Sequence, residues 1–301
     1  MQPRVAVVVS SLGRPECLAA LWARLCVQTL KPHRVVFSVV STGDAPSGLA
    51  ASADASPPEV VLSPKGLTKQ RNRGIDRVID DADVIAFLDD DYVPSRHALA
   101  GIARAFDAHP SASGITGMIL ADGVRGGGIG EEEASAIVDR WDAAHPMDER
   151  DDAPRVIARL DGLYGCNMAW RVSAMGATRF DERLPLYGWL EDIDFAARVP
   201  GEKVKVDSFA GVHRGVKGGR ERRGCLLGYS QIANPLYMYR KGTISSRFAL
   251  RLCLRNLLSN HLRAFSPEPW IDRRGRMRGN WQAIRDAARG RADPARILDL
   301  A

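Results

Sequence analysis

The chain has 301 residues, of which 45% are hydrophobic, so it can bury a substantial core. The apolar runs Val5–Val9 and Val84–Leu88 are far shorter than the roughly 20 residues that cross a bilayer, and the N-terminus lacks a signal-peptide pattern. These features predict a cytoplasmic protein without a membrane-spanning helix. Five scattered cysteines without a CxxC pair favour reduced thiols over disulfides or a zinc site.

The net charge of +6 conceals a strong asymmetry along the chain. Residues 201–301 hold 21 Lys and Arg against 8 Asp and Glu, a net +13, which leaves −7 for residues 1–200. The C-terminal third is therefore a basic module. Phosphates, anionic lipid headgroups and nucleic acid are all partners for such a segment, and charge alone does not choose among them.

Apolar β-branched runs alternate with helical patterns along the first 120 residues. The expected strands are Arg4–Ser10, Val35–Val40, Glu59–Leu62, Val84–Leu88 and Gly114–Leu120. The expected helices are Pro15–Thr29, one from Thr68, Arg96–Ala108 and a short one at Ala134–Trp141. This alternation predicts an α/β fold, with a Rossmann-type, mostly parallel sheet flanked by helices.

In open α/β sheets the ligand crevice lies beyond the carboxyl ends of the strands, so polar residues there are candidate site residues. Those ends are Ser10 and Ser11, the segment that reaches Asp44, and Asp89 to Asp91. Three adjacent carboxylates repel one another unless a cation offsets them. Mg²⁺ and Mn²⁺ suit oxygen ligands and are completed by substrate phosphates. The competing interpretation is a solvated turn that caps the next helix.

A second group of polar residues follows between residues 162 and 199. Trp189 offers a flat apolar face of the kind that stacks on sugar rings, and Glu191 and Asp192 follow directly. If Trp189–Val199 is helical, both carboxylates lie in its first turn, where the helix dipole favours the ionised form that a general base needs. The alternative is a charged amphipathic helix without a catalytic role.

The ordered motifs resemble those of the family 2 glycosyltransferases, which have the GT-A fold. The family's Asp-x-Asp signature matches Asp89–Asp91, and its Gly-x-Asn-Met-Ala-x-Arg segment matches Gly165–Arg171. A Phe-Asp-Glu turn at Phe180–Glu182 and a Glu-Asp-x-Asp helix start at Glu191–Asp194 follow in order. The resemblance extends across most of residues 4–213.

The resemblance implies a role for each matching residue. Asp91 would bind the metal, Asp89 the ribose or the metal, and Asp90 would support them, while Asp192 would act as general base oriented by Glu191. His213 matches a late histidine that binds metal in many relatives, although a structural role is equally expected of a lone histidine. The expected donor-site residues are Ser10, Ser11, Asp44, Arg71, Asp89, Asp90, Gly165 and Asn167, and the expected acceptor residues are Trp189 and Glu191.

The first two strand ends depart from the family pattern. The first reads Ser-Ser-Leu-Gly-Arg over residues 10–14 in place of Pro-Thr-Tyr-Asn, and the second lacks the early aspartate. Asp44 replaces the usual uracil contact, or the donor is not a uridine nucleotide. Arg214, Lys217, Arg220, Arg222 and Arg223 form a Gly-spaced basic loop that either closes over a diphosphate or is a solvated connector.

We expect two domains, residues 1–213 for nucleotide-sugar binding and catalysis and residues 214–301 as a basic, mainly helical region. Within the latter, Ile244–Phe265 is a basic amphipathic helix with Arg247, Arg251 and Arg255 at four-residue spacing. It either packs on the catalytic domain or lies on the inner face of an anionic membrane, near a lipid-linked acceptor. Nucleic acid is not an expected partner, because no stacking platform accompanies the charge.

Together these features predict an inverting glycosyltransferase that uses Mn²⁺ or Mg²⁺. It would move a sugar from a nucleotide-diphosphate sugar to an acceptor hydroxyl on a glycan, polysaccharide or lipid-linked saccharide. Two alternatives remain. A nucleotidyltransferase would share the acidic metal site but needs a Gly-rich phosphate loop, of which SLGRPE is a poor version. A non-catalytic membrane- or nucleic-acid-binding protein would leave Glu191 and Asp192 without a function.

Overall fold

The computed structural model describes residues 2–49, 56–146, 153–218 and 223–300. The chain divides into two compact units. The sheet unit comprises Met1–Lys65, Lys69–Arg179 and Val199–Val216, and the helical unit comprises Gly66–Thr68, Phe180–Arg198 and Lys217–Ala301. The functional division expected at residue 213 stays a prediction.

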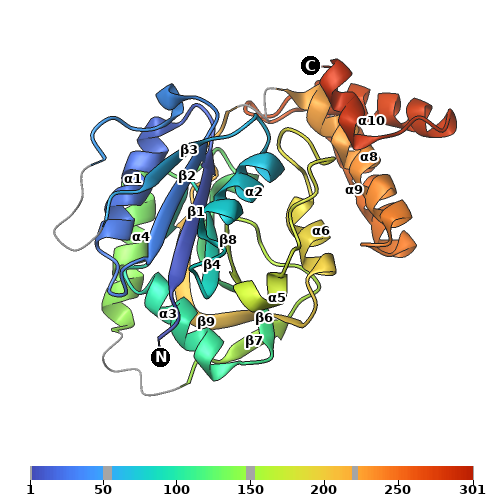
Figure 1. Cartoon of the computed structure of the whole chain (residues 1–301). Coiled ribbons are helices and arrows are strands. Elements are labelled where there is room, and N and C mark those ends of the chain that lie inside the picture. Colours follow the sequence, from blue (N-terminus) through green and yellow to red (C-terminus); the bar gives the residue numbers. More distant parts are fainter. Residues whose placement is uncertain (1, 50–55, 147–152, 219–222, 301) are drawn as a thin grey trace. The chain divides into compact units, whose positions relative to one another are not determined.

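The sheet unit is built on one mixed sheet, drawn in Figure 1. Its strands are β1 (Val5–Ser11), β2 (Arg34–Val39), β3 (Glu59–Leu62), β4 (Val84–Asp89), β5 (Tyr92–Pro94), β6 (Ala112–Asp122), β7 (Val156–Arg159), β8 (Asn167–Arg171) and β9 (Glu202–His213). Their order is β3-β2-β1-β4-β8-β6-β9-β5, with β7 paired to β9. Strands β3, β2, β1 and β4 run parallel, as do β6 and β9, whereas the pairings of β8, β5 and β7 are antiparallel. The predicted α/β class is confirmed.

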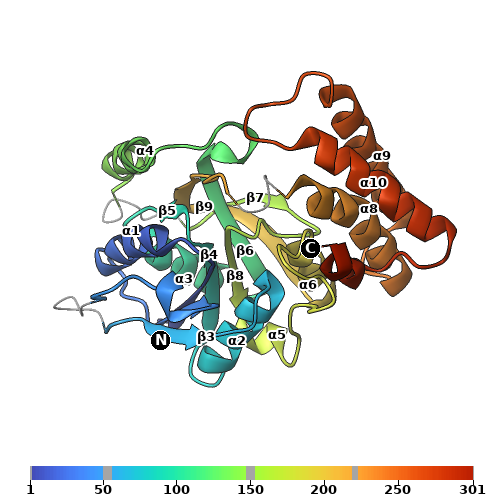
Figure 2. The same cartoon turned by 90° about the horizontal axis from the view of Figure 1, so that it is seen from above.

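Helices cover both faces of the parallel strands. They are α1 (Pro15–Cys26), α2 (Leu67–Val78), α3 (Ala98–Ala108), α4 (Glu131–Ala144) and the short α5 (Val172–Met175), with 3-10 turns η1 (Thr42–Asp44) and η2 (Gly123–Arg125). In β1, Val5, Val7 and Val9 join the core formed with α1 and α3. On the opposite face Val8 meets α2 so closely that a Cβ on Gly74 would lie 2.3 Å from it. Figures 1 and 2 show α1 and α2 on opposite sides of these strands. Burial on both faces explains the uninterrupted apolar run.

Strand β8 is the main element that the sequence analysis did not anticipate as a strand. It lies between β4 and β6 and pairs antiparallel with both. Four of its five residues, Asn167 to Trp170, are buried. The segment had been interpreted only as a family motif, and its position in the middle of the sheet makes part of that motif a structural element.

The helical unit contains α6 (Glu191–Arg198), α8 (Gly224–Lys241), α9 (Ser246–Arg263), α10 (Arg273–Ala288) and the 3-10 turn η3 (Pro294–Leu300). Its apolar core includes Tyr229 and Ile232 of α8 and Ala283 of α10. The buried amide of Asn260 on α9 donates to Gln231 Oε1 at 2.8 Å and to Asn280 Oδ1 at 2.9 Å, so all three long helices share one polar contact. None of the helices described here is long and apolar enough to span a membrane.

Helices α8 and α10 meet through glycines at four-residue spacing on each helix. These are Gly224 and Gly228 on α8 and Gly275 and Gly279 on α10. A Cβ on Gly228 would lie 2.1 Å from the carbonyl oxygen of Arg276, and one on Gly279 would lie 2.0 Å from that of Cys225. At Gly228 and Gly279 the two backbones are therefore in direct contact, and a side chain at either position would force the helices apart.

We expect Gly228→Ala and Gly279→Ala each to lower the free energy of unfolding. Alanine is favoured over glycine in a helix by about 1 kcal/mol, but overpacking costs about 1–3 kcal/mol, and here the clash is with backbone atoms that cannot rotate away. Urea unfolding of the full chain, followed by far-ultraviolet circular dichroism, measures the change. Gly126→Ala is the control, because a Cβ there meets no atom within 4 Å. Equal or greater stability of both variants would contradict the contact.

Candidate functional site

Asp89, Asp90 and Asp91, called the acidic group below, lie at the carboxyl end of β4. Asp89 is the last residue of β4 and lies in register with Ser10 of β1. His213 is the last residue of β9 and pairs with Tyr92, the first residue of β5. Because β5 follows Asp91 directly, this pairing brings His213, which comes much later in the chain, next to the acidic group.

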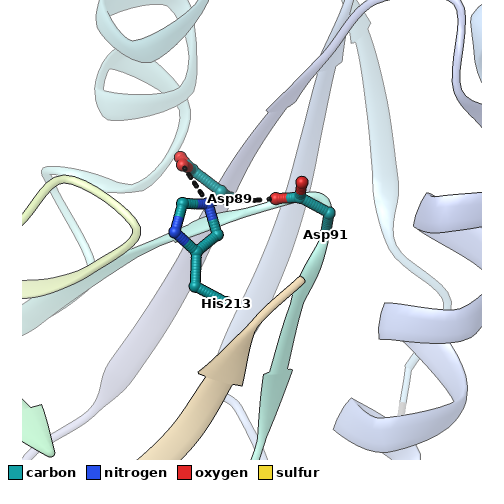
Figure 3. A group of neighbouring side chains, drawn as sticks. All are labelled: Asp89, Asp91 and His213. Atoms are coloured by element: carbon teal, nitrogen blue, oxygen red, sulfur yellow. Dashed lines mark ion pairs between the residues drawn. The ribbon is translucent and has the colours of Figure 1, made fainter. Parts of the chain in front are cut away.

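Figure 3 shows the imidazole of His213 facing the two carboxylates of Asp89 and Asp91. His213 Nε2 lies 3.4 Å from Asp91 Oδ1 and 3.7 Å from Asp89 Oδ2. One potential ligand atom from each residue lies within 4.8 Å of the others. Two carboxylates and an imidazole are an acceptable donor set for Mn²⁺ and a somewhat poorer one for Mg²⁺. The residues present fit a divalent cation.

The other ring nitrogen of His213 is held by two residues that the sequence analysis missed. Nδ1 lies 3.3 Å from Asp122 Oδ1 and 3.1 Å from the hydroxyl oxygen of Tyr164, and that hydroxyl donates to Asp122 Oδ2 at 2.9 Å. A carboxylate on the second nitrogen of a histidine directs the first toward a metal and raises its basicity. This arrangement is a second observation that favours a cation between His213 and the aspartates. The signal for it in the sequence is that Asp122 closely follows the predicted strand Gly114–Leu120.

Two arginines offset the charge of the three adjacent carboxylates. Arg14 Nη2 lies 2.6 Å from Asp90 Oδ1, and Arg14 Nη1 lies 3.4 Å from Asp91 Oδ2. Arg71 Nη2 lies 3.2 Å from Asp89 Oδ1 and donates to the carbonyl of Gly165 at 3.0 Å. The structure thus brings together Arg71, Gly165 and the acidic group, all expected in the donor site, and adds Arg14, which had not been assigned a role.

The charges of the site are strongly coupled. Burial raises the pKa of Asp90 to about 7, assisted by the charges of Asp91 and Asp89 and opposed by Arg14. Burial also acts to raise the pKa of Asp91, but its contacts with His213, the charge of Arg14 and the Val216 amide outweigh that effect and lower the pKa to about 2. Burial acts to lower the pKa of His213, and its hydrogen bonds with Asp122 and Asp91 raise it above the ordinary value.

Three of the other donor-site candidates lie at the same edge of the sheet. Ser11 donates from Oγ to Asp90 Oδ2 at 2.6 Å, whereas the buried Ser10 hydroxyl has no hydrogen-bond partner among the described residues. Asp44 accepts from the amides of Gly13 and Ser41, both at 2.9 Å, so it joins the loops after β1 and β2.

Asn167 occupies a different environment, inside the sheet. It is buried and its side-chain amide contacts the hydroxyls of Thr116 and Tyr92.

The backbone after β9 also contacts the acidic group. The Arg214 amide donates to the Asp91 carbonyl at 3.1 Å, and the Val216 amide donates to Asp91 Oδ2 at 2.8 Å. The beginning of the predicted basic loop therefore lies against the carboxylate expected to bind the metal. Arg220 and Arg222 of that loop lie outside the described residues.

Trp189, Glu191 and Asp192 belong to the helical unit. Glu191 and Asp192 lie in the first turn of α6, as predicted, although the helix begins at Glu191 and not at the expected Trp189. Glu191 is buried and its Oε2 accepts from the Asp192 amide at 2.5 Å. The carbonyl of Trp189 accepts from Asn234 Nδ2 at 2.8 Å. Leu190 has a φ of 74°, a left-handed conformation that costs a leucine on the order of 1 kcal/mol or more and is typical of constrained functional segments. This residue turns the chain directly into Glu191.

A comparison with protein families identifies the N-terminal segment. The model of the family described as glycosyl transferase family 2 matches residues 6–130, which include β1, the acidic group and Asp122. Residues 6–130 are therefore similar to glycosyltransferase family 2. No curated protein matches this chain.

Solved structures similar to this chain share little sequence with it. A crystal structure of TarS from S. aureus has 13% identity and a TM-score of 0.48, covering 88% of this chain and 44% of its own. TarS 1–349 in complex with UDP has 13% identity and a TM-score of 0.47, covering 95% and 91%. A197 from STIV has 14% identity and a TM-score of 0.39, covering 68% and 83%. This chain thus spans less than half the length of the first of these proteins.

We expect Asp122→Ala to weaken Mn²⁺ binding about 10- to 100-fold, the usual effect of removing the residue that orients a histidine ligand. Electron paramagnetic resonance of free Mn²⁺ measures this affinity without requiring turnover. Asp207→Ala is the control, because Asp207 lies on the same strand as His213, β9, but pairs with the exposed Arg155. An unchanged affinity in Asp122→Ala would remove His213 from the ligand set.

Proposed function

We propose that this chain is a metal-dependent inverting glycosyltransferase, which moves a sugar from a nucleotide-diphosphate sugar to an acceptor hydroxyl. The observation that carries the proposal is the convergence of Asp89, Asp91 and His213 at the carboxyl end of β4. Asp89 and Asp91 lie within the segment that matches the model of glycosyl transferase family 2. A solvated turn would not require a buried histidine aimed at both carboxylates and held from behind by Asp122.

Asp89, Asp91 and His213 would hold Mn²⁺ or Mg²⁺. A divalent cation in this position supplies Lewis-acid stabilisation to a departing diphosphate. Arg71 would contribute positive charge near the same phosphates, and its contact with Asp89 keeps the guanidinium in place. Asp90 would serve the site indirectly, because its carboxylate is engaged by Arg14 and Ser11 and keeps Arg14 beside Asp91.

Asp192 would accept the proton of the attacking acceptor hydroxyl. Its position in the first turn of α6 favours the ionised carboxylate that this task needs. Glu191 accepts from the Asp192 amide and would fix the start of the helix, and Trp189 would stack on the acceptor sugar. Direct displacement by the hydroxyl inverts the anomeric configuration.

The donor side would include the polar residues at the ends of β1 and β2. Ser10 would belong to the donor side because its buried hydroxyl has no hydrogen-bond partner among the described residues. Asp44 already accepts two backbone amides, which favours a role in shaping the nucleotide pocket over direct recognition of a base edge. Gly165 would contribute through its backbone beside Arg71, and Asn167 by supporting β8 from within the sheet.

The first test is a thermal-shift panel of nucleoside diphosphates, nucleoside triphosphates and nucleotide sugars, each with and without Mn²⁺. A ligand that binds only the native state raises its stability, by about 2.7 kcal/mol at a concentration one hundred times its dissociation constant. We expect nucleoside diphosphates and nucleotide sugars to stabilise the chain only with Mn²⁺, and Asp91→Asn to abolish that stabilisation. Stabilisation by triphosphates alone, with release of pyrophosphate, would instead indicate a nucleotidyltransferase.

The second test concerns the base. We expect Asp192→Asn to lower turnover about 10²- to 10⁴-fold, the typical contribution of a positioned general base, while the thermal shift with donor and Mn²⁺ is retained. Donor hydrolysis or transfer to a saccharide acceptor provides the rate. Asp299→Asn, an exposed aspartate of the helical unit outside the family motifs, is the control and should keep the wild-type rate. A wild-type rate in Asp192→Asn would remove Asp192 from this role.

A further inference from the structure

Helix α9 presents a row of leucines to solvent. Leu250, Leu254, Leu258 and Leu262 recur every four residues and are 60%, 48%, 59% and 73% exposed. The opposite side of the helix, with the buried Ala249, Leu252 and Asn260, packs within the helical unit. Single exposed leucines are ordinary on protein surfaces, but four in a row along one helix form a continuous apolar strip that calls for a partner.

Arginines lie along the same strip. Arg247, Arg251 and Arg255 are exposed, and the last two each follow one of the leucines directly. The exposed side of α10 adds Arg274, Arg278 and Arg285. The only acidic residue in α9 and α10 is Asp286, which is buried and bonded to Tyr229 and Arg296. The exposed charged side chains of the two helices are therefore all basic.

Two exposed aromatic residues adjoin the leucine strip. Trp281 of α10 is 47% exposed, and its indole N–H donates to His261 Nε2 on α9 at 2.7 Å. His261 follows Leu254 by seven residues, two helical turns, and therefore lies close to the same face. Phe265, just beyond the end of α9, is 90% exposed. We call the four leucines, Trp281, Phe265 and the six arginines the leucine–arginine face.

We propose that the leucine–arginine face docks on an anionic lipid membrane. The leucines, Trp281 and Phe265 would enter the boundary between headgroups and acyl chains, and the arginines would extend their guanidinium groups to the lipid phosphates. An exposed apolar row interleaved with cations is the pattern of an interfacial helix, and tryptophan is enriched at this depth.

Charge favours an anionic membrane over a second copy of the chain as the partner of the leucine–arginine face. Two copies joined through α9 would place arginine rows against each other, with no acidic residue on either helix to neutralise them. An anionic bilayer neutralises all six. Nucleic acid would also neutralise the arginines, but it would leave the four leucines in water. The inference concerns where the chain works and does not depend on the proposed transfer reaction.

The experiment is co-sedimentation of the full chain with vesicles of phosphatidylcholine alone or mixed with phosphatidylglycerol. We expect binding to the mixed vesicles only, weakened by salt because the Debye length shortens. Leu254→Gln together with Leu258→Gln should lower the partition coefficient about tenfold or more, since each leucine withdraws apolar surface from water. Arg251→Gln together with Arg255→Gln should lower it by a similar factor on anionic vesicles.

The matched control is Leu62→Gln together with Leu298→Gln, two leucines outside the face that are 54% and 53% exposed. It should bind like the wild type. Circular dichroism and the thermal shift with nucleotide and Mn²⁺ should be unchanged in every variant, which separates this test from that of the proposed function.

Four results would overturn the inference. The first is wild-type protein that stays in the supernatant with anionic vesicles. The second is wild-type binding by the leucine variant. The third is a dimer, seen by light scattering, that the leucine variant dissociates while vesicles are not bound, which would assign the face to self-association. Binding of RNA that survives the leucine substitutions, without vesicle binding, would likewise assign the arginines to nucleic acid.

Discussion

Three consecutive carboxylates at the end of a buried strand set the central constraint on the sheet unit. Burial of like charges is costly unless cations from elsewhere meet them. Arg14 comes from the start of α1, Arg71 from α2 and His213 from the end of β9, so three separate segments are tied to one strand end. The pairing of β5 with β9 is the backbone counterpart of this arrangement, because it seats His213 beside Asp91. A metal ion would bind among carboxylates whose charge the fold already balances with Arg14, Arg71 and His213.

Local reasoning was sufficient to find much of this site in the sequence. Asp89 to Asp91 follow a clear apolar run, and the position of ligand sites at strand ends then directs attention to them. Arg71 and His213 were found through the family resemblance, and the structure places both against the acidic group. Three residues of the site were missed: Asp122, Tyr164 and Arg14. Their contribution depends on strand register and side-chain direction, which cannot be read from a single sequence for residues so far apart in the chain.

The fold was predictable to a similar degree and for similar reasons. The parallel strands with strong apolar runs were located to within one or two residues, and β3 was located with both ends correct. Strand β8 was not, because its five residues, all within the Gly165–Arg171 motif, are too few to show a strand periodicity and are stabilised by β4 and β6. Helices α8 and α10 were expected only as part of a mainly helical region, although the four-residue spacing of glycines in both segments was a usable signal.

The glycine contact between α8 and α10 also bears on how the helical unit opens. Backbone atoms that touch leave no room for water, so amide protons near Gly228 and Gly279 can exchange with solvent only when the two helices separate. Exchange at these amides therefore reports separation of the pair, whereas amides on the outer turns of α9 exchange through local fraying. The slowest-exchanging amide protons of the helical unit should therefore lie around Gly228 and Gly279, where backbone meets backbone without intervening side chains.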